Sequence, residues 1–143
     1  MTHETNQWIY KNNPFLESDV GDFIGFVYLI TEISTGRKYI GKKIFYNKVV
    51  KPPLKGKSRR RISRKFSDWQ TYYSSSDEIK DIVAGQGDAD YKREILRLCM
   101  SKAEMSYFET KEIFSRDALL KDEYINKWVS SRIQKNQLKS VIV

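Results

Sequence analysis

Hydrophobic residues gather first in two short stretches with a turn between them. Gly25 to Thr31 and Lys38 to Phe45 are rich in Val, Ile, Tyr and Phe, and "ISTGR" separates them. Such runs around a glycine-containing turn predict a β-hairpin, with Gly36 in the left-handed conformation. A later stretch, "YKREILRLC" from Tyr91 to Cys99, predicts a third strand.

Helices are expected beside these strands. The first spans about Asp77 to Ala84 and stops at Gly85 in "GQGDAD". The next begins at the capping box "SKAE", where Ser101 can accept from the Glu104 backbone N–H, and runs to about residue 114. A further helical piece is expected to hold Leu119, Leu120, Tyr124 and Ile125. The pattern therefore predicts an α+β fold, a small three-stranded antiparallel sheet flanked by helices.

The predicted hairpin brings polar side chains to one face. If "STGR" is a four-residue turn, Ile30 lies opposite Gly41 and Tyr28 lies opposite Lys43. Tyr28, Tyr39 and Lys43 then project from the same face, and Gly41 leaves that face open. A neighbouring cation stabilises a phenolate, so one tyrosine could serve as a general base. Ordinary cross-strand aromatic packing is the alternative.

Two carboxylates fall on an apolar face of the last main helix. Met105, Phe108 and Ile113 form one stripe at helical spacing, and Glu109 and Glu112 lie inside it. A carboxylate on a buried face is costly unless something binds it. Either it pairs with a Lys or Arg, or it holds Mg²⁺ together with waters and substrate phosphates.

The charge distribution points to a polyanionic partner. The 143-residue chain has a net charge of +8, and residues 33–67 contain no Asp or Glu but hold 13 of the 26 Lys and Arg. Pro52, Pro53 and Gly56 argue against a regular element across "KPPLKGKSRRRISRK". A solvated basic loop is one interpretation; a segment that follows a phosphate backbone is favoured. The predicted DNA contacts are Lys42, Lys55, Lys57, Arg59, Arg60, Arg61, Lys65 and Trp69.

Composition excludes several classes of protein. Cys99 is the only cysteine and His3 the only histidine, so a disulfide framework, a Cys/His zinc site and His-dependent hydrolases are not expected. Apolar runs are far shorter than a membrane span needs, and the N-terminus lacks signal-peptide features. We therefore expect a cytoplasmic protein with no membrane partner and no small-molecule cofactor; the residues leave its oligomeric state open.

The order of these motifs resembles a known family. "FVY" at Phe26 to Tyr28 and "YIG" at Tyr39 to Gly41 are followed by a basic segment, a short helix, a strand and a Glu-bearing helix. This order resembles the GIY-YIG nuclease superfamily. With "SDWQTYYSSS", "YFETKEIF" and "YIN", the chain from Gly25 to Asn126 looks most like phage-borne Seg-type homing endonucleases.

The resemblance implies roles for particular residues. Tyr28 and Tyr39 match the signature tyrosines, and Glu109 matches the glutamate that binds a single divalent metal, Mg²⁺ or Mn²⁺. Asn126 matches an asparagine that organises the site. The family's arginine has no match at its usual place, and Arg64 is favoured over the neighbouring arginines. A family histidine is missing, and either Tyr72 or Tyr73 would have to substitute for it.

The interpretation that we favour is a metal-dependent endonuclease that hydrolyses double-stranded DNA, of a phage homing type. We expect a lead-in at 1–22, a nuclease domain at 23–128 with a basic insertion at 44–67, and a polar tail at 129–143. Two alternatives remain. One is a DNA-binding protein that uses the basic 37–65 segment without catalysis, and the other is a PD-(D/E)xK nuclease, because "ETK" at Glu109 to Lys111 fits ExK.

Overall fold

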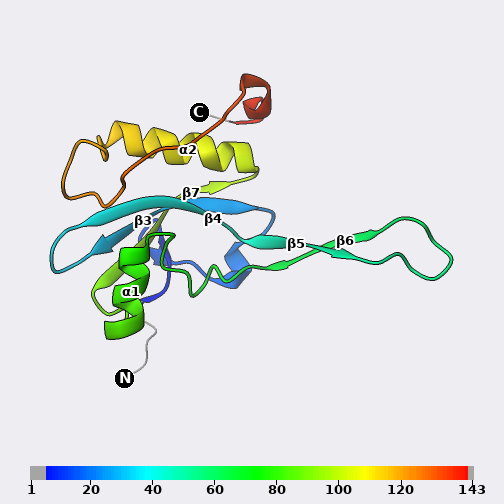
Figure 1. The fold of residues 1–143 in the computed structure, drawn as a ribbon, viewed down its shortest axis with the longest axis horizontal. Helices are drawn as coiled ribbons and strands as arrows, with labels where there is room; N and C mark the ends of the chain where they lie inside the picture. The colour runs from blue at the N-terminus through cyan, green and yellow to red at the C-terminus, as the bar shows by residue number, and fades with distance from the viewer. Residues whose placement is uncertain (1–5, 142–143) are drawn as a thin grey trace.

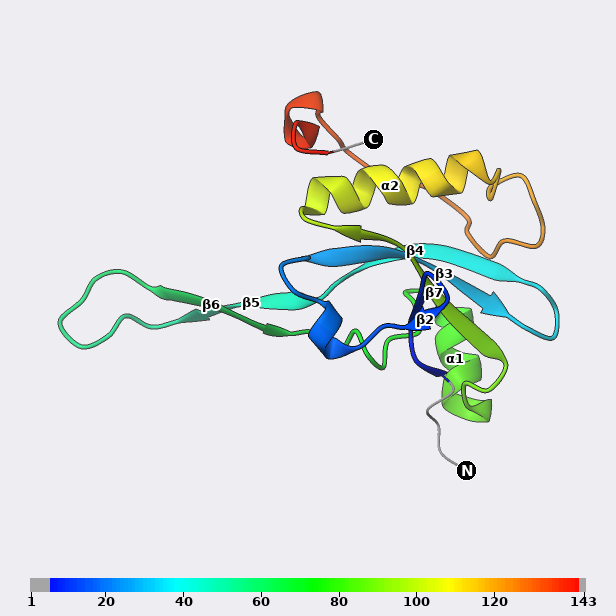
Figure 2. The same cartoon turned by 180° about the vertical axis from the view of Figure 1, so that it is seen from behind.

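A central sheet forms the body of the molecule. The computed structural model describes residues 6–141, and Figures 1 and 2 show the molecule from two opposite directions. The sheet has five strands in the order β2-β1-β7-β3-β4 rather than the predicted three. They are β1 (Ile9–Tyr10), β2 (Asn13–Pro14), β3 (Gly25–Glu32), β4 (Lys38–Ile44) and β7 (Tyr91–Cys99). The predicted antiparallel hairpin and third strand are present, while β1 pairs with β7 in parallel and makes the sheet mixed.

The hairpin register differs from the prediction by two residues. Tyr28 lies opposite Gly41 and Phe26 opposite Lys43, because the turn covers residues 32–37 instead of 34–37. The Glu32 carboxylate causes the wider turn: it accepts hydrogen bonds from Thr35 and Arg37 within the turn and from Tyr91 on β7. A shift of two preserves the face of every side chain. Gly36 has the predicted positive φ, at 76°.

The basic insertion is a regular structure. β5 (Tyr46–Lys51) and β6 (Arg61–Phe66) pair along their whole length and form a second, two-stranded antiparallel sheet. This β5–β6 ribbon extends away from the body (Figure 1). The expectation of an irregular segment holds only for the tip, residues 52–60, which contains both prolines and a glycine with positive φ. Proline cannot donate to a ladder, but the residues flanking it can pair.

The two α-helices cover opposite faces of the central sheet (Figures 1 and 2). α1 (Asp77–Gln86) packs Ile79 into a core with Tyr28 and Phe26. α2 (Lys102–Ser115) packs the predicted stripe of Met105, Phe108 and Ile113 against Val27, Leu29 and Ile40. The Ser101 hydroxyl accepts from the Glu104 N–H at 3.1 Å, as the capping box predicted. Short 3₁₀ turns occur at Glu17–Asp19 and Lys135–Leu138.

The end of the first predicted helix and the whole of the third were wrong. α1 begins at the predicted Asp77 but continues through Gly85 to Gln86, and its cap is Gly87, whose positive φ of 84° suits a helix end. The residues after α2 form turns instead of the expected helical piece, and Tyr124 makes a parallel bridge to Lys38. The open edge of β4 supplies backbone partners there, because Ile125 N–H donates to Lys38 O at 2.7 Å. Within residues 6–141, no helix is long and apolar enough to span a bilayer.

The segment before the hairpin, expected as a lead-in, packs its apolar side chains into the core. Trp8, Phe15 and Val20 are buried in the core on the α1 side. Arg93 of β7, only 4% exposed, donates to the carbonyls of Asn6, Gln70 and Tyr72. Its guanidinium also lies 4.7 Å from the Trp8 ring centre. This arginine therefore ties the N-terminal segment and the loop before α1 to the sheet.

Candidate active site

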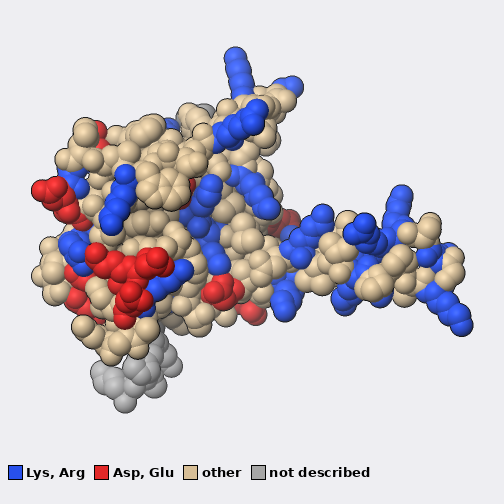
Figure 3. Space-filling view, in the orientation of Figure 1, with Lys and Arg blue, Asp and Glu red and all other residues tan. Residues whose placement is uncertain are grey.

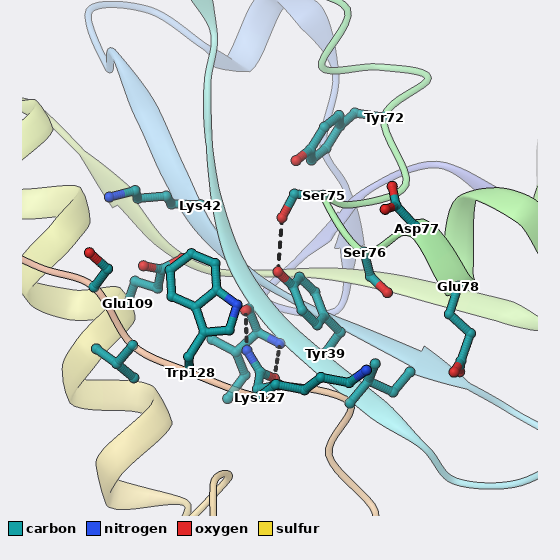
Figure 4. Close-up of a pocket in the computed structure, with 15 residues that line it drawn as sticks. Tyr39, Lys42, Tyr72, Ser75, Ser76, Asp77, Glu78, Glu109, Lys127 and Trp128 are labelled. Carbon is teal, nitrogen blue, oxygen red and sulfur yellow. Dashed lines mark hydrogen bonds between the residues drawn. The ribbon is translucent and has the colours of Figure 1, made fainter.

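A cavity of about 580 Å³ lies along the outer strand β4. It takes side chains from both faces of the sheet, from the start of α1, from α2 and from the segment after residue 124 (Figure 4). The cavity is lined by Tyr39, Ile40, Lys42, Tyr72, Ser75, Ser76, Asp77, Glu78, Glu109, Ile125, Asn126, Lys127, Trp128, Val129 and Ser130. Three of the predicted catalytic residues, Tyr39, Glu109 and Asn126, therefore meet at one place.

The Glu109 carboxylate is half-buried at this cavity. Among the residues described, it has no ion pair or hydrogen bond, and burial raises the pKa of its carboxyl while the charge of Lys42 lowers that pKa in part. Glu112, by contrast, pairs with Arg116 at 2.9 Å. The two explanations offered for these glutamates thus apply to different residues: Glu112 is ion-paired, and Glu109 is left available for a ligand.

Tyr28 lies behind the cavity rather than in it. Its ring packs over Gly41, where a Cβ would come within 2.5 Å of Tyr28 Cζ. The side chain is fully buried, and within the described chain its hydroxyl makes no hydrogen bond of normal geometry. Burial raises the pKa of Tyr28 well above 10, and the nearby Tyr72 raises it further. These surroundings favour a neutral phenol over the expected general base.

Tyr39 is the signature tyrosine that faces the cavity. Its hydroxyl lies 2.8 Å from Ser75 Oγ, just before α1. Tyr72 also lines the cavity, and burial raises the pKa of its phenol. Tyr73 points elsewhere and donates to Asp88 at 2.6 Å. Of the two candidates to substitute for a histidine, Tyr72 is therefore the one in position.

Asn126 is bound to the edge of β4. Its Oδ1 accepts from Ile40 N–H at 3.0 Å and its Nδ2 donates to Ile40 O at 2.8 Å. The side-chain amide thus replaces a neighbouring strand at the residue between Tyr39 and Gly41. The amide therefore fixes the segment after α2 against β4, and the organising role implied by the resemblance stays a prediction.

The two adjacent lysines of β4 have different surroundings. Lys43 is on the face of Tyr28, as predicted, but its ammonium lies 2.6 Å from Asp68 and 4.2 Å from the Tyr72 ring centre. The hydrogen bond from Lys43, together with its positive charge, lowers the pKa of the Asp68 carboxyl, and Lys43 does not line the cavity. Lys42 lines the cavity and donates to Ser106 of α2 at 2.8 Å. The cation next to Glu109 is therefore Lys42.

Comparison with known families decides the assignment. A family model described as "Putative endonuclease segE, GIY-YIG domain" matches residues 8–129. The chain belongs to the GIY-YIG family. Searches of curated proteins and of solved structures gave no match. The assigned GIY-YIG domain is a nuclease domain, and its matched range includes the N-terminal segment that Arg93 holds.

Two further predicted site residues of this GIY-YIG domain, Arg64 and Trp69, do not line the cavity. Arg64 lies on the β5–β6 ribbon, opposite Lys48, with its guanidinium 4.0 Å from the Tyr46 ring centre. Trp69 is 1% exposed, so the predicted contact with DNA is incompatible with its position. It fills the core, and its carbonyl accepts from Trp8 Nε1. The catalytic role of Arg64 stays a prediction, while the DNA contact of Trp69 was wrong because a basic, aromatic-rich segment does not reveal which of its side chains turn inward.

Sequence reasoning missed several residues that line the cavity of the GIY-YIG domain. They are Ser75, Ser76, Asp77, Glu78, Lys127 and Trp128. "SSSDE" resembles a helix start, and "NKW" follows the asparagine that was identified. The helix-start signal, which closely follows Tyr72, could have indicated residues 75–78. Nothing in the local sequence places residues 127–128 beside β4, because that depends on the pairing of Ile125 with Lys38.

The donors at the cavity are compatible with a hard divalent cation. The described residues include no cluster of three or more His, Cys, Asp or Glu that would form a complete protein cage. Glu109 offers a carboxylate without an ion-pair partner, and the cavity has room for water and phosphate oxygens. Mg²⁺ is commonly held in this way, by one or two carboxylates with waters and substrate phosphates.

Proposed function

We propose that this GIY-YIG domain is a divalent-metal-dependent endonuclease that hydrolyses phosphodiester bonds of double-stranded DNA. The observation that carries the proposal is the convergence of Glu109, Tyr39 and Lys42 on one cavity at the edge of β4. An available carboxylate, a phenol and an ammonium are the groups required at a site for water attack on a phosphodiester.

Each of these groups has a part in the chemistry. Glu109 would hold Mg²⁺ or Mn²⁺, and the bound ion would supply charge stabilisation for the phosphoryl oxygens. The Tyr39 hydroxyl, oriented by Ser75, would position the attacking water by hydrogen bonding. The Lys42 ammonium would bind the phosphate and offset its developing charge, the role that was expected of Arg64. These assignments make Tyr39 the water-facing tyrosine and Tyr28 its buried support.

The β5–β6 ribbon suits a duplex partner. Between residues 46 and 66 there are nine Lys and Arg and no acidic residue, and every residue of β6 is exposed. Figure 3 shows these basic side chains along the ribbon, while the acidic side chains gather mainly on the body at the opposite end. Lysines and arginines placed on phosphates release counterions and favour binding. The ribbon would therefore hold the DNA while the cavity cuts it.

The test is cleavage of supercoiled plasmid with Mg²⁺ or with EDTA. We expect wild-type cutting in Mg²⁺ only, and its loss in Glu109→Gln. Glu112→Gln is the matched control on the same helix, since Glu112 is engaged by Arg116, and it should cut normally. Tyr39→Phe should lose activity, and Tyr73→Phe should retain it. Equal cutting by Glu109→Gln and wild type would contradict the proposed site.

The structure argues against one of the two alternatives and leaves the other to experiment. Glu109 to Lys111 lie within α2, so "ETK" does not have the strand setting that a PD-(D/E)xK motif requires. A purely DNA-binding protein would bind plasmid in a salt-sensitive manner and leave it intact with Mg²⁺. The homing role in a phage stays a prediction from the family resemblance, and host cell cytoplasm is its corresponding location.

A further inference from the structure

Trp128 is an exposed tryptophan at the candidate active site. The other two tryptophans, Trp8 and Trp69, are each 1% exposed, whereas Trp128 is 73% exposed. Figure 4 shows it among the cavity side chains, with Glu109 on one side and Tyr39 on the other. An aromatic side chain of this size buries 150–250 Å² when it is covered, so a partner that covers it gains substantially.

The chain is anchored to the body on both sides of Trp128, and this keeps the indole at the surface. Two residues before it, the Asn126 amide makes two hydrogen bonds to the backbone of Ile40. One residue after it, Val129 packs against the core on the α2 side. The chain is therefore anchored around Trp128, and the exposure of the indole follows from its position in a fixed segment.

The surroundings of the indole match a nucleotide. The adjacent Lys127 and the facing Lys42 bring positive charge for phosphate groups, and the hydroxyls of Ser75 and Ser76 offer hydrogen bonds. Each base has a flat π-face, and stacking of a base on an aromatic side chain is independent of sequence. A protein partner would gain little from the lysines, whereas a nucleic acid uses both the aromatic ring and the charge.

We propose that Trp128 stacks on a base of the DNA strand next to the phosphate that is cut. This inference rests on the proposed nuclease function and adds a substrate contact to it. A base that stacks on Trp128 has left its place in the duplex, so the strand at the cavity is locally opened. The indole would thereby fix the nucleotide relative to Tyr39 and Glu109.

Fluorescence quenching tests the contact without cleavage. Because Trp8 and Trp69 are buried, acrylamide should quench mainly Trp128 in Glu109→Gln, a variant chosen to bind without cutting. A DNA duplex is then added with Mg²⁺ until fluorescence anisotropy shows that the protein is saturated. At that point we expect the acrylamide-quenchable tryptophan fluorescence to fall to the level of the Glu109→Gln/Trp128→Phe double variant. Unchanged quenching at saturation would overturn the proposal. Loss of quenching when the protein concentration is raised without DNA would also overturn it, since a second copy of the protein would then cover the indole.

Activity provides the second test. In the otherwise wild-type protein, Trp128→Phe should retain most plasmid cleavage, and Trp128→Leu should lose about 5- to 150-fold in kcat/KM, as expected for one stacked base. Phe114→Leu is the matched control, because Phe114 is an exposed aromatic of α2 that does not line the cavity. Full activity of Trp128→Leu would contradict the stacking contact but leave the nuclease function standing. A wild type that never cuts contradicts the nuclease function itself.

Discussion

Gly41→Ala tests the close contact that places Tyr28 behind the candidate site. The new methyl group would lie 2.5 Å from Tyr28 Cζ, where an ordinary contact begins at 3.4 Å, so the ring would have to move by about 1 Å. The ring has little room, because Trp8 and Tyr72 pack against it with centroids 5.4 and 5.9 Å away. Overpacking of this kind costs roughly 1–3 kcal/mol.

Part of that cost is offset in the unfolded chain. Gly41 is not among the positive-φ glycines, so alanine fits the backbone and reduces unfolded-state entropy by about 0.4–1 kcal/mol. The net loss should be about 1–2 kcal/mol, which lowers Tm by roughly 3–8 °C for a domain of this size. Thermal unfolding followed by circular dichroism measures this change.

Two further variants identify the cause. Gly85→Ala is the control, since Gly85 is in α1 with nothing near its Cβ position, and it should stabilise by about 0.5–1 kcal/mol. Gly41→Ala should cost less in a Tyr28→Leu background, with a coupling of about 1 kcal/mol. If Gly41→Ala melts at or above the wild-type Tm, or shows no coupling to Tyr28, the packing argument is refuted.

Five other perturbations have definite expected outcomes. Tyr28→Phe removes a buried hydroxyl that lacks a normal hydrogen bond, so Tm should stay or rise by the equivalent of at most ~1 kcal/mol, and a clear fall in Tm would contradict this. Glu109→Gln should stabilise the metal-free protein by about 0.5–2 kcal/mol at pH 7–8. Burial raises the pKa of Glu109 in the folded state, so the wild-type protein loses stability as pH rises through that pKa. Below the unfolded pKa near 4.5 the carboxyl is protonated in both states, and the stability gained by Glu109→Gln should vanish. Added Mg²⁺ should raise the Tm of wild type but not of Glu109→Gln, and equal shifts would argue against Glu109 as a ligand. Arg93→Met leaves three carbonyls without their donor and should cost about 3 kcal/mol or more in urea unfolding. Replacing residues 47–65 by a short turn should reduce the slope of log K for DNA binding against log salt by about 0.9 per lost phosphate contact, and an unchanged slope would place the DNA elsewhere.

Elements with local signals were predictable from sequence. The strand Tyr91–Cys99 has the predicted bounds, and the Ser101 cap contacts the predicted N–H. Glu109 was identified by its match to the family glutamate, and among the described residues it has no ion pair, whereas Glu112 pairs with Arg116. These features depend on a few consecutive residues, so one sequence contains their signals.

Features that depend on distant partners were not predictable in the same way. The hairpin register was wrong by two residues because Glu32 is held by Tyr91, which lies 59 positions away. The β5–β6 ribbon was missed because its strands pair across a proline-containing tip. Trp69 was assigned to the surface, yet its burial depends on Trp8, 61 positions earlier. In each case the deciding contact is tertiary.

The amide of Asn126 has a consequence for solubility as well as for the site. β4 is the last strand of the sheet, and an uncovered last strand offers its backbone to other chains. Asn126 and the segment leading to it occupy those groups at Lys38 and Ile40. Asn126→Ala should therefore expose a template for strand addition, so this variant should aggregate more readily as it loses activity. On this reasoning, the side chain that lines the cavity would also limit strand addition at the edge of the sheet.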